Sequence, residues 1–324
     1  MELIRGFYNL RHRHRGCAVT IGNFDGVHAG HQFLVDTVCQ HADERQLRAC
    51  VVSFDPLPVE YFLPADKHPP RLTGLREKAT ALANSPLDQL LLLRFNRALA
   101  ETSAQDFIKK VLVEGLDTQY LMVGDDFQFG KNREGDFALL EASGKQYGFT
   151  LQKAETVLHS GKRVSSTRIR ELLTDGALDA AAELLGRHYA LEGRVEYGAQ
   201  LGRTIGFPTA NIGLKNHRPP LRGVFAVEVS ILPGAGPDKD SGTDSGAING
   251  IANIGIKPTV NGERLSLEVH LMNFSGDLYG QRLRLKFLHK LRDEKKFSGL
   301  DELKAAIATD EQNAILWFSQ QINQ

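Results

Sequence analysis

The stretch TIGNFDGVHAGH, residues 20–31, decides the fold of the first half of this chain. It ends an apolar run that begins near Cys17, and it leads into an amphipathic segment that contains Phe33 and Val38. Glycine, asparagine and aspartate break the apolar run at 22–26. This order predicts a strand, a tight loop and the start of a helix. Because ligands of open α/β sheets bind at the carboxyl ends of strands, this loop is the first candidate for a binding site.

Two histidines and a glycine at the predicted helix start form a candidate nucleotide site. His28 and His31 are three residues apart, so they share one helix face. Backbone N–H groups and the helix dipole favour anions there, and Gly30 leaves room for a phosphate or a purine ring. We therefore predict that the site binds a nucleoside triphosphate. The predicted phosphate-binding set also includes the loop residues Gly22, Asn23 and Phe24.

The same histidine pair has two other interpretations. A His-x-x-His pair could be half of a zinc site, but zinc usually takes four ligands and no cysteine is close in sequence. The two residues could also be ordinary surface histidines at a helix start. Their place directly after the first predicted strand favours the nucleotide interpretation.

Composition limits the class of protein. A length of 324 residues predicts two domains, and a hydrophobic content of 42% is enough for packed cores. No apolar run reaches membrane-spanning length, and the first residues lack the pattern of a secretory signal. Three cysteines with no metal-binding spacing predict reduced thiols in a cytoplasmic protein. The net charge is zero, and the basic cluster at 11–15 is predicted to be a solvated loop, so we expect no nucleic-acid partner.

The chain changes pattern near residue 186. Before it, strand-like runs alternate with helical ones, which predicts a parallel sheet with helices on both faces. After it, strand-like runs separated by glycines and prolines predict a compact antiparallel barrel with a terminal helix. We therefore predict two domains, 1–186 and 187–324. The predicted strands are 17–22, 48–54, 89–95, 119–124, 149–157, 189–195, 222–232, 247–254, 264–273 and 281–291. The predicted helices are 30–46, 73–84, 103–114, 136–147, 166–174, 177–185 and 300–322. The polar segment 233–246 is predicted to be a mobile loop.

Two more motifs carry polar groups in the first half. In VGDDFQFG (123–130), Asp126 lies beside Phe127 and Phe129, and an acidic pair with aromatics suits a flat ring and a ribose. A polar turn with two core phenylalanines explains this segment equally well. In VSSTRIRELL (164–173), hydroxyl residues and an arginine open a helix and could hold outer phosphates. These residues are Ser165, Ser166, Thr167 and Arg170.

The second half has a candidate magnesium site. In GAQLGRTIGFPTANI (198–212), glycines make a phosphate-binding loop plausible, and Thr209 and Asn211 offer two oxygens on one side of an extended chain. Magnesium accepts such ligands together with phosphates and water. Glu268 lies in the predicted strand LSLEVHL, on the face opposite to Leu267 and Val269. It is either a solvent-facing carboxylate or a base in a site.

Taken together, these motifs resemble prokaryotic bifunctional riboflavin kinase/FMN adenylyltransferase (FAD synthetase). The segments GNFDGVHAGH, FDPLPVEYF (54–62), RLTGLREK (71–78), VGDDFQFG and VSSTRIR match the adenylyltransferase half. The segments GRTIGFPTAN, GVFAV (223–227), ANIGIKPT (252–259), LEVHLMNF (267–274) and LRDEKKF (291–297) match the kinase half. The match covers nearly the whole chain in the family's order. It departs at Ala29, where many members carry a basic residue, and in the length of the loop 233–246.

The resemblance implies a Rossmann-like nucleotidylyltransferase domain and a six-stranded barrel, each using ATP and Mg²⁺. It implies that riboflavin is phosphorylated to FMN and that FMN is adenylylated to FAD with release of pyrophosphate. By matching motif, His28 and His31 act on ATP, Thr209 and Asn211 hold the kinase Mg²⁺, and Glu268 is the kinase base. The other implied ATP contacts are Gly202, Arg203, Thr204 and Gly206, and the other implied flavin contacts are Arg292 and Glu294. The alternatives are an adenylyltransferase with another acceptor and a non-catalytic flavin-binding regulator. The oligomeric state is not predicted.

Overall fold

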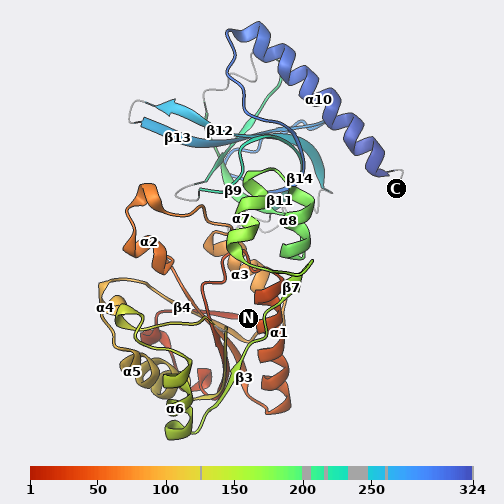
Figure 1. Cartoon of the computed structure of the whole chain (residues 1–324). Helices are drawn as coiled ribbons and strands as arrows, with labels where there is room; N and C mark the ends of the chain where they lie inside the picture. Colours follow the sequence, from red (N-terminus) through yellow and green to blue (C-terminus); the bar gives the residue numbers. More distant parts are fainter. Residues whose placement is uncertain (125, 199–205, 215–217, 233–246, 260–261, 323–324) are drawn as a thin grey trace. The chain divides into compact units, whose positions relative to one another are not determined.

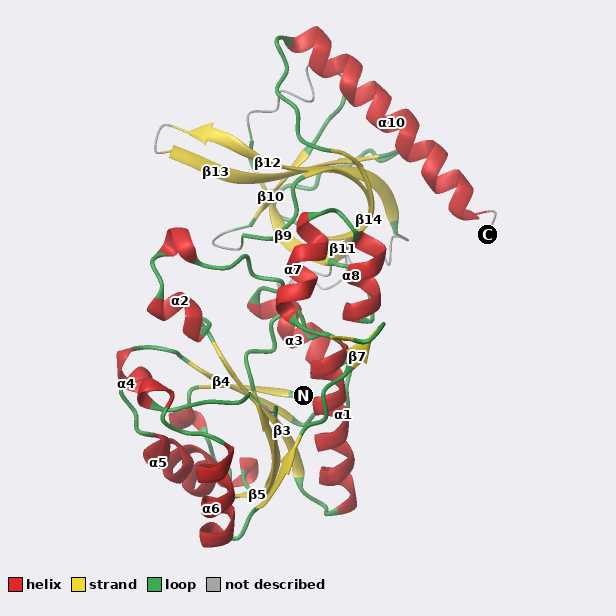
Figure 2. Ribbon diagram, in the orientation of Figure 1, coloured by secondary structure: helices red, strands yellow, loops and turns green. Residues whose placement is uncertain are grey.

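The computed structural model describes residues 1–124, 126–198, 206–214, 218–232, 247–259 and 262–322. The chain divides into two compact units, Met1–Ser166 and Thr167–Gln324. The first contains a parallel sheet between helices, and the second contains a barrel and a long terminal helix (Figures 1 and 2). In the part of the chain that is described, no helix combines the length and apolar character needed to cross a membrane.

Six parallel strands form the sheet of the first unit. Their order across the sheet is β1-β4-β3-β2-β5-β6. They are β1 (Glu2–Arg5), β2 (Cys17–Ile21), β3 (Arg48–Phe54), β4 (Gln89–Leu93), β5 (Thr118–Val123) and β6 (Thr150–Lys153). The predicted parallel sheet is confirmed. The prediction missed β1, an edge strand with Ile4 as its one buried residue, because so short a segment shows no periodic pattern.

Helices cover both faces of this sheet. One face packs against α1 (Ala29–Glu44) and α3 (Leu75–Ala83), and the other packs against a π-helical segment, η4 (Ile108–Gly115), and α6 (Phe137–Tyr147). Successive strand residues alternate between the two cores, as Val19 and Ala18 of β2 do. The smaller elements are η1 (Phe7–Asn9), η2 (His12–His14), α2 (Pro58–Phe62), η3 (Ala65–Lys67), α4 (Arg97–Ala100), α5 (Ala104–Phe107), η5 (Lys131–Arg133), β7 (Leu158–His159) and β8 (Lys162–Arg163).

The basic cluster at 11–15 is not only a solvated loop, as its composition suggested. His14 is 3% exposed, and its Nε2 lies 3.1 Å from Glu2 Oε1. Arg13 contacts the same carboxylate at 2.9 Å. Two residues of the cluster, Arg13 and His14, therefore anchor the edge strand β1.

The second unit is a closed six-stranded antiparallel barrel, in the order β10-β13-β12-β11-β14-β9. Its strands are β9 (Ala190–Glu196), β10 (Ala210–Gly213), β11 (Gly223–Leu232), β12 (Ile248–Thr259), β13 (Gly262–Leu271) and β14 (Arg282–Arg292). Its helices are α7 (Ser166–Thr174), α8 (Leu178–Leu185) and α10 (Leu300–Ile322). The barrel and terminal helix confirm the prediction, and only the short β10 was not predicted from the residue pattern.

The terminal helix covers part of the outer barrel surface. Ala314 and Phe318 of α10 pack against Val224, Ala226 and Ile251 on β11 and β12. This face of the barrel is the one on which Glu268 lies, since Leu267 and Val269 on either side of it are buried in the other direction.

Candidate active sites

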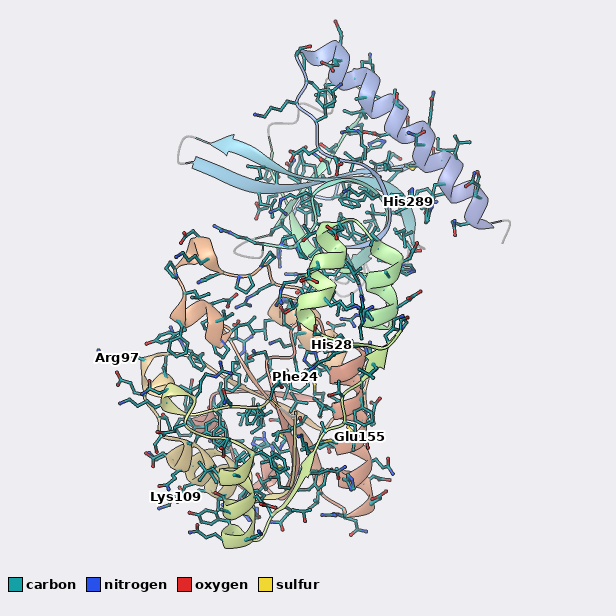
Figure 3. The ribbon with its side chains drawn as sticks, in the orientation of Figure 1. Phe24, His28, Arg97, Lys109, Glu155 and His289 are labelled. Atoms are coloured by element: carbon teal, nitrogen blue, oxygen red, sulfur yellow. The ribbon has the colours of Figure 1, made fainter. Side chains whose placement is uncertain are left out.

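The loop 22–28 follows β2, the strand at which the strand order reverses, so that later strands are added on the other side of the sheet. The chain passes from β2 to β3 and β4 on one side, and β5 then pairs with β2 on the other side. The carboxyl ends of β2 and β5 therefore border the crevice in which open α/β sheets bind ligands. Figure 3 labels Phe24 and His28 at this end of the sheet, where α1 begins. The structure thus places TIGNFDGVHAGH and VGDDFQFG at the two sides of one switch point.

His28 caps α1 and stacks on His31. Its Nδ1 accepts a hydrogen bond from the His31 backbone N–H at 3.3 Å, and it is 6% exposed. The two imidazole rings are parallel, with centroids 3.7 Å apart. Because Nδ1 accepts, the proton of a neutral His28 ring is on Nε2, which can donate to an anion. In this stacked arrangement the ring nitrogens of His28 and His31 do not point toward one shared metal ion, which argues against the zinc interpretation.

Gly30 brings a distant segment against the first turn of α1. A Cβ on Gly30 would lie 3.3 Å from His28 Nδ1 and 3.7 Å from the Val164 carbonyl oxygen. Ser166 follows, and its hydroxyl donates to the Asp25 carbonyl at 2.9 Å. The hydroxyl of Ser166 therefore holds the loop, while Ser165 stands beside it, half-buried. Thr167 and Arg170 continue along α7 in the second unit.

The loop backbone is held in an unusual conformation. Phe24 has φ +47° and Val27 has φ +42°, values that L-residues rarely adopt and that cost energy. The side chains of both residues are buried, so Phe24 offers a ligand only its backbone. Asp25 fixes the loop, because its carboxylate accepts hydrogen bonds from the backbone N–H groups of Leu72 (3.0 Å) and Thr73 (3.0 Å). The residue pattern did not identify this role of Asp25, because its partners lie 47 and 48 positions further along the chain.

A hollow of about 340 Å³ follows β5. Its lining includes Asp126, Phe127, Gln128, Arg133, Asp136, Phe137 and Ala138. Asp126 is exposed and pairs with Arg163 at 3.2 Å. Phe127 stacks on Phe129 with centroids 5.4 Å apart, but Phe129 belongs to the core. Of the predicted flavin contacts here, Asp126 and Phe127 line the hollow and Phe129 supports them.

A second aromatic group was not predicted. Phe54 ends β3, Phe95 follows β4, and both rings contact neighbours: Phe54 lies against Phe95, and Phe95 lies against Tyr61 and Phe62. Phe62 is 64% exposed. The carboxyl ends of the parallel strands β3 and β4 therefore position this aromatic group at the edge of the sheet where ligands bind.

An ion-pair cluster stands at the same end of the sheet. Arg71 pairs with Glu60 through two nitrogens and with Asp55 at 3.1 Å. Burial alone would lower the pKa of Arg71, but the two carboxylates raise it, so the guanidinium stays charged. The signal for this cluster was present in the quoted motifs FDPLPVEYF and RLTGLREK, whose charges the pattern analysis left without a role.

In the second unit, the barrel register brings the predicted magnesium and base residues together. Asn211 on β10 pairs directly with Glu268 on β13, and Asn253 on β12 pairs with Glu268 from the other side. Thr209, two residues before Asn211, lies on the same side of the extended chain. All four side chains are half-buried. A Cβ on Gly198 would overlap the Asn211 amide, so the predicted glycine loop begins against this group.

His270 supports the same strand segment. Its Nδ1 lies 2.8 Å from the Pro208 carbonyl oxygen, and its Nε2 lies 3.8 Å from Glu311 on α10. Because a carbonyl only accepts, Nδ1 carries a proton. His270 therefore joins the residue before Thr209 to the terminal helix.

The two predicted flavin contacts after β14 have different surroundings. Arg292 makes two hydrogen bonds of 2.8 Å to Asp310 on α10, and its guanidinium lies over the Phe297 ring. Glu294 is exposed, and its carboxylate lies against Gly255, where a Cβ would overlap it. Gly206 is described and has φ +90°, whereas Gly202, Arg203, Thr204 and the segment 233–246 lie outside the described residues. Within the described ranges, no three His, Cys, Asp or Glu side chains group to hold a metal.

Two family models match the chain in tandem. The model described as FAD synthetase matches residues 10–168, and the model described as riboflavin kinase matches residues 185–318. The predicted border at 186/187 stays a prediction, because α7 and α8 lie between the two family models or at their edges and group with the second compact unit.

Curated relatives match over almost the full length. The bifunctional riboflavin kinase/FMN adenylyltransferase of Escherichia coli K12 is 46% identical over 98% of both chains, and that of Haemophilus influenzae is 43% identical over 98% of this chain and 100% of its own. A solved structure named as a macrolide-efflux protein from Streptococcus pneumoniae is 27% identical, with a TM-score of 0.78 over 96% of this chain and 98% of its own.

Proposed function

The chain belongs to the family of bifunctional riboflavin kinases/FMN adenylyltransferases, and from this premise we propose which residues carry its two reactions. The protein is a transferase that phosphorylates riboflavin to FMN with ATP and then adenylylates FMN to FAD. We assign adenylyl transfer to 1–186 and the kinase to 187–324, in keeping with the two motif sets.

The first unit supplies positioning and charge stabilisation for adenylyl transfer. The FMN phosphate attacks the α-phosphate of ATP, and pyrophosphate leaves. A phosphate nucleophile is already an anion, so no strong base is needed. The backbone N–H groups at the start of α1 and the Nε2 of His28 would donate hydrogen bonds to the phosphates, where negative charge builds up. The stacked His28–His31 pair capping α1 is the observation that carries this assignment.

The flavin would lie beside this site. Asp126 and Phe127 at the hollow offer a polar group and a ring face, and the exposed Phe62 with Tyr61 and Phe95 offers further flat apolar surface. We propose that these groups, which follow the carboxyl ends of β3, β4 and β5, select FMN over other acceptors.

In the barrel, Glu268 is the proposed base. Its carboxylate takes the proton from the ribityl hydroxyl of riboflavin, the hydroxyl oxygen attacks the γ-phosphorus of ATP, and ADP leaves. Asn211 pairs with Glu268, and Thr209 lies two residues before Asn211 on the same side of the chain, so the hydroxyl and amide oxygens form a donor set that fits Mg²⁺. When bound, Mg²⁺ would neutralise charge on the transferred phosphoryl group. Asn211 and Asn253 lie opposite Glu268 on the two neighbouring strands, so their side chains flank the carboxylate.

One assay tests the assignment against its rivals. The purified protein is incubated with riboflavin, ATP and Mg²⁺, and FMN and FAD are separated. Formation of both products is expected. A parallel incubation offers pantetheine phosphate or nicotinamide mononucleotide in place of riboflavin, and transfer of adenylate only to one of these would indicate another acceptor. Flavin binding without product would indicate a non-catalytic regulator. We also propose that the protein is cytoplasmic and has no nucleic-acid partner.

A further inference from the structure

A buried lysine lies beneath the loop that carries the adenylyl-transfer site. Lys78 is on α3, and it is 4% exposed. Its Nζ donates hydrogen bonds to the Asn23 carbonyl at 2.7 Å and to the Ser53 hydroxyl at 3.2 Å. Ser53 in turn donates to the same Asn23 carbonyl at 3.2 Å. The carbonyl of one loop residue therefore accepts from two buried groups on two different elements.

This carbonyl lies at the start of the strained part of the loop. Phe24 follows Asn23 with φ +47°, and the chain then reaches the cap residue His28. A residue keeps such a conformation only when its surroundings over-determine it. Lys78 and Ser53 hold the beginning of the strained segment, and Asp25 is held by the Leu72 and Thr73 backbone N–H groups.

Burying an ammonium without a carboxylate in hydrogen-bond contact is costly. The charged groups that act on Lys78 are Asp25, Asp55, Glu60 and Arg71. The Asp25 carboxylate is used by backbone N–H groups, and Arg71 already pairs with Asp55 and Glu60. Replacing a buried charged group by apolar packing is often neutral or stabilising, so the stability of the fold does not by itself account for this ammonium.

We propose that Lys78 is a positioning residue for adenylyl transfer, which fixes the Asn23 carbonyl and thereby the loop that presents His28 and His31. It does not touch the substrates. The inference rests on the adenylyl-transfer function proposed above. Failure of the wild-type protein to make FAD would refute that function, whereas FAD formation that does not depend on Lys78 would refute only this inference.

The main test replaces the ammonium with an apolar chain of similar length. Lys78→Met should lower kcat for FAD formation from FMN and ATP by roughly 100-fold, since displacement of reacting groups by about 1 Å can cost that much. The KM values should change by a few-fold at most. The thermal unfolding of the first unit, Met1–Ser166, is the control for folding, and riboflavin phosphorylation by the same sample controls for the amount of protein. The matched control is Lys109→Met, at an exposed lysine of η4 that Figure 3 labels, and it should change neither activity.

A pH profile separates positioning from a merely structural role. Burial lowers the pKa of Lys78 to about 8. Carboxylates and guanidinium groups keep their charge throughout the alkaline range. FAD formation by the wild type should therefore fall as pH rises through about 8, and this fall should be absent in Lys78→Met and shifted above pH 10 in Lys78→Arg.

Two results would overturn the inference. One is near-normal FAD formation by a folded Lys78→Met protein. The other is a wild-type profile with no fall near pH 8, and this measurement needs no variant, so a substituted protein that fails to fold does not protect the proposal.

Discussion

Replacing His28 separates its role as a helix cap from its role toward ATP. In the structure, His28 Nδ1 caps α1 at 3.3 Å, and its ring stacks on His31. His28→Ala removes both the cap and the ring. His28→Ser keeps a good capping hydroxyl but has no group that reaches a phosphate. Comparing the two variants therefore isolates the imidazole.

The expected magnitudes differ for stability and rate. Loss of an N-cap costs about 1 kcal/mol, which lowers Tm by roughly 2–4 °C for a domain of the size of Met1–Ser166. His28→Ala should show this loss, and His28→Ser should largely escape it. Loss of one preorganised donor to developing charge costs on the order of 10²–10³ in kcat. Both variants should show that loss in FAD formation from FMN.

The assay measures Tm, FAD formation from supplied FMN and FMN formation from riboflavin on each variant. FMN formation should be unchanged, because Glu268 and its neighbours belong to the other unit. If His28→Ser makes FAD within a few-fold of the wild-type rate, the imidazole has no role toward ATP and His28 is only a cap. The same series on His31, together with a metal assay of the wild type, tests the zinc interpretation.

Four further outcomes are expected. Glu268→Gln should lose roughly 10²–10⁴-fold in FMN formation and keep FAD formation from supplied FMN, and near-normal FMN formation would exclude Glu268 as the base. A chain of residues 167–324 should fold and make FMN but no FAD. The shorter chain 187–324 should do the same at a lower Tm, because it lacks the buried residues of α8. A folded fragment without kinase activity would contradict the division into two units. Replacing 233–246 with a short glycine turn should leave both activities near wild type, and a large kinase loss in a folded variant would show a role for the loop. The pKa of Lys78 is lowered from 10.5 to about 8, so between these pH values the unfolded chain binds more protons than the folded chain. The free energy of unfolding should therefore rise with pH in this range, and urea titrations at pH 7 and pH 10 should show a gain of up to roughly 3 kcal/mol that Lys78→Met lacks. Equal gains in the wild type and in Lys78→Met would refute the assignment.

Long periodic segments made most of the fold predictable. Alternation of strand-like and helical runs gave the parallel sheet, and the barrel strands followed from period-two patterns in 222–291. The edge strand β1 and the short β10 escaped because four residues carry too little pattern. The register that places Asn211 against Glu268 also needed the structure, since pairing between residues 57 positions apart along the chain depends on the closed barrel.

The candidate sites were predictable where a motif is local and less so where partners come from elsewhere. His28, Gly30 and His31 lie within one turn, so spacing alone placed them together. The roles of Asp25 and Lys78 depend on contacts with residues about 50 positions away, which no local pattern reveals. Arg292 shows the reverse case: its motif suggested a flavin contact, and the structure adds a buried partner, Asp310, that anchors α10.

The parallel arrangement of the first sheet also decides where this protein tolerates engineering. Every group assigned to adenylyl transfer in that unit comes from the carboxyl ends of strands or from the segments packed on them. The turns at the opposite edge, 45–47 between α1 and β3, 84–88 between α3 and β4, and 148–149 between α6 and β6, carry none of these groups. A fluorescent reporter or an affinity handle inserted at 45–47 would thus stand at the far end of the strands from the nucleotide. Flavin turnover could then be followed in a tagged protein whose chemistry the tag does not approach.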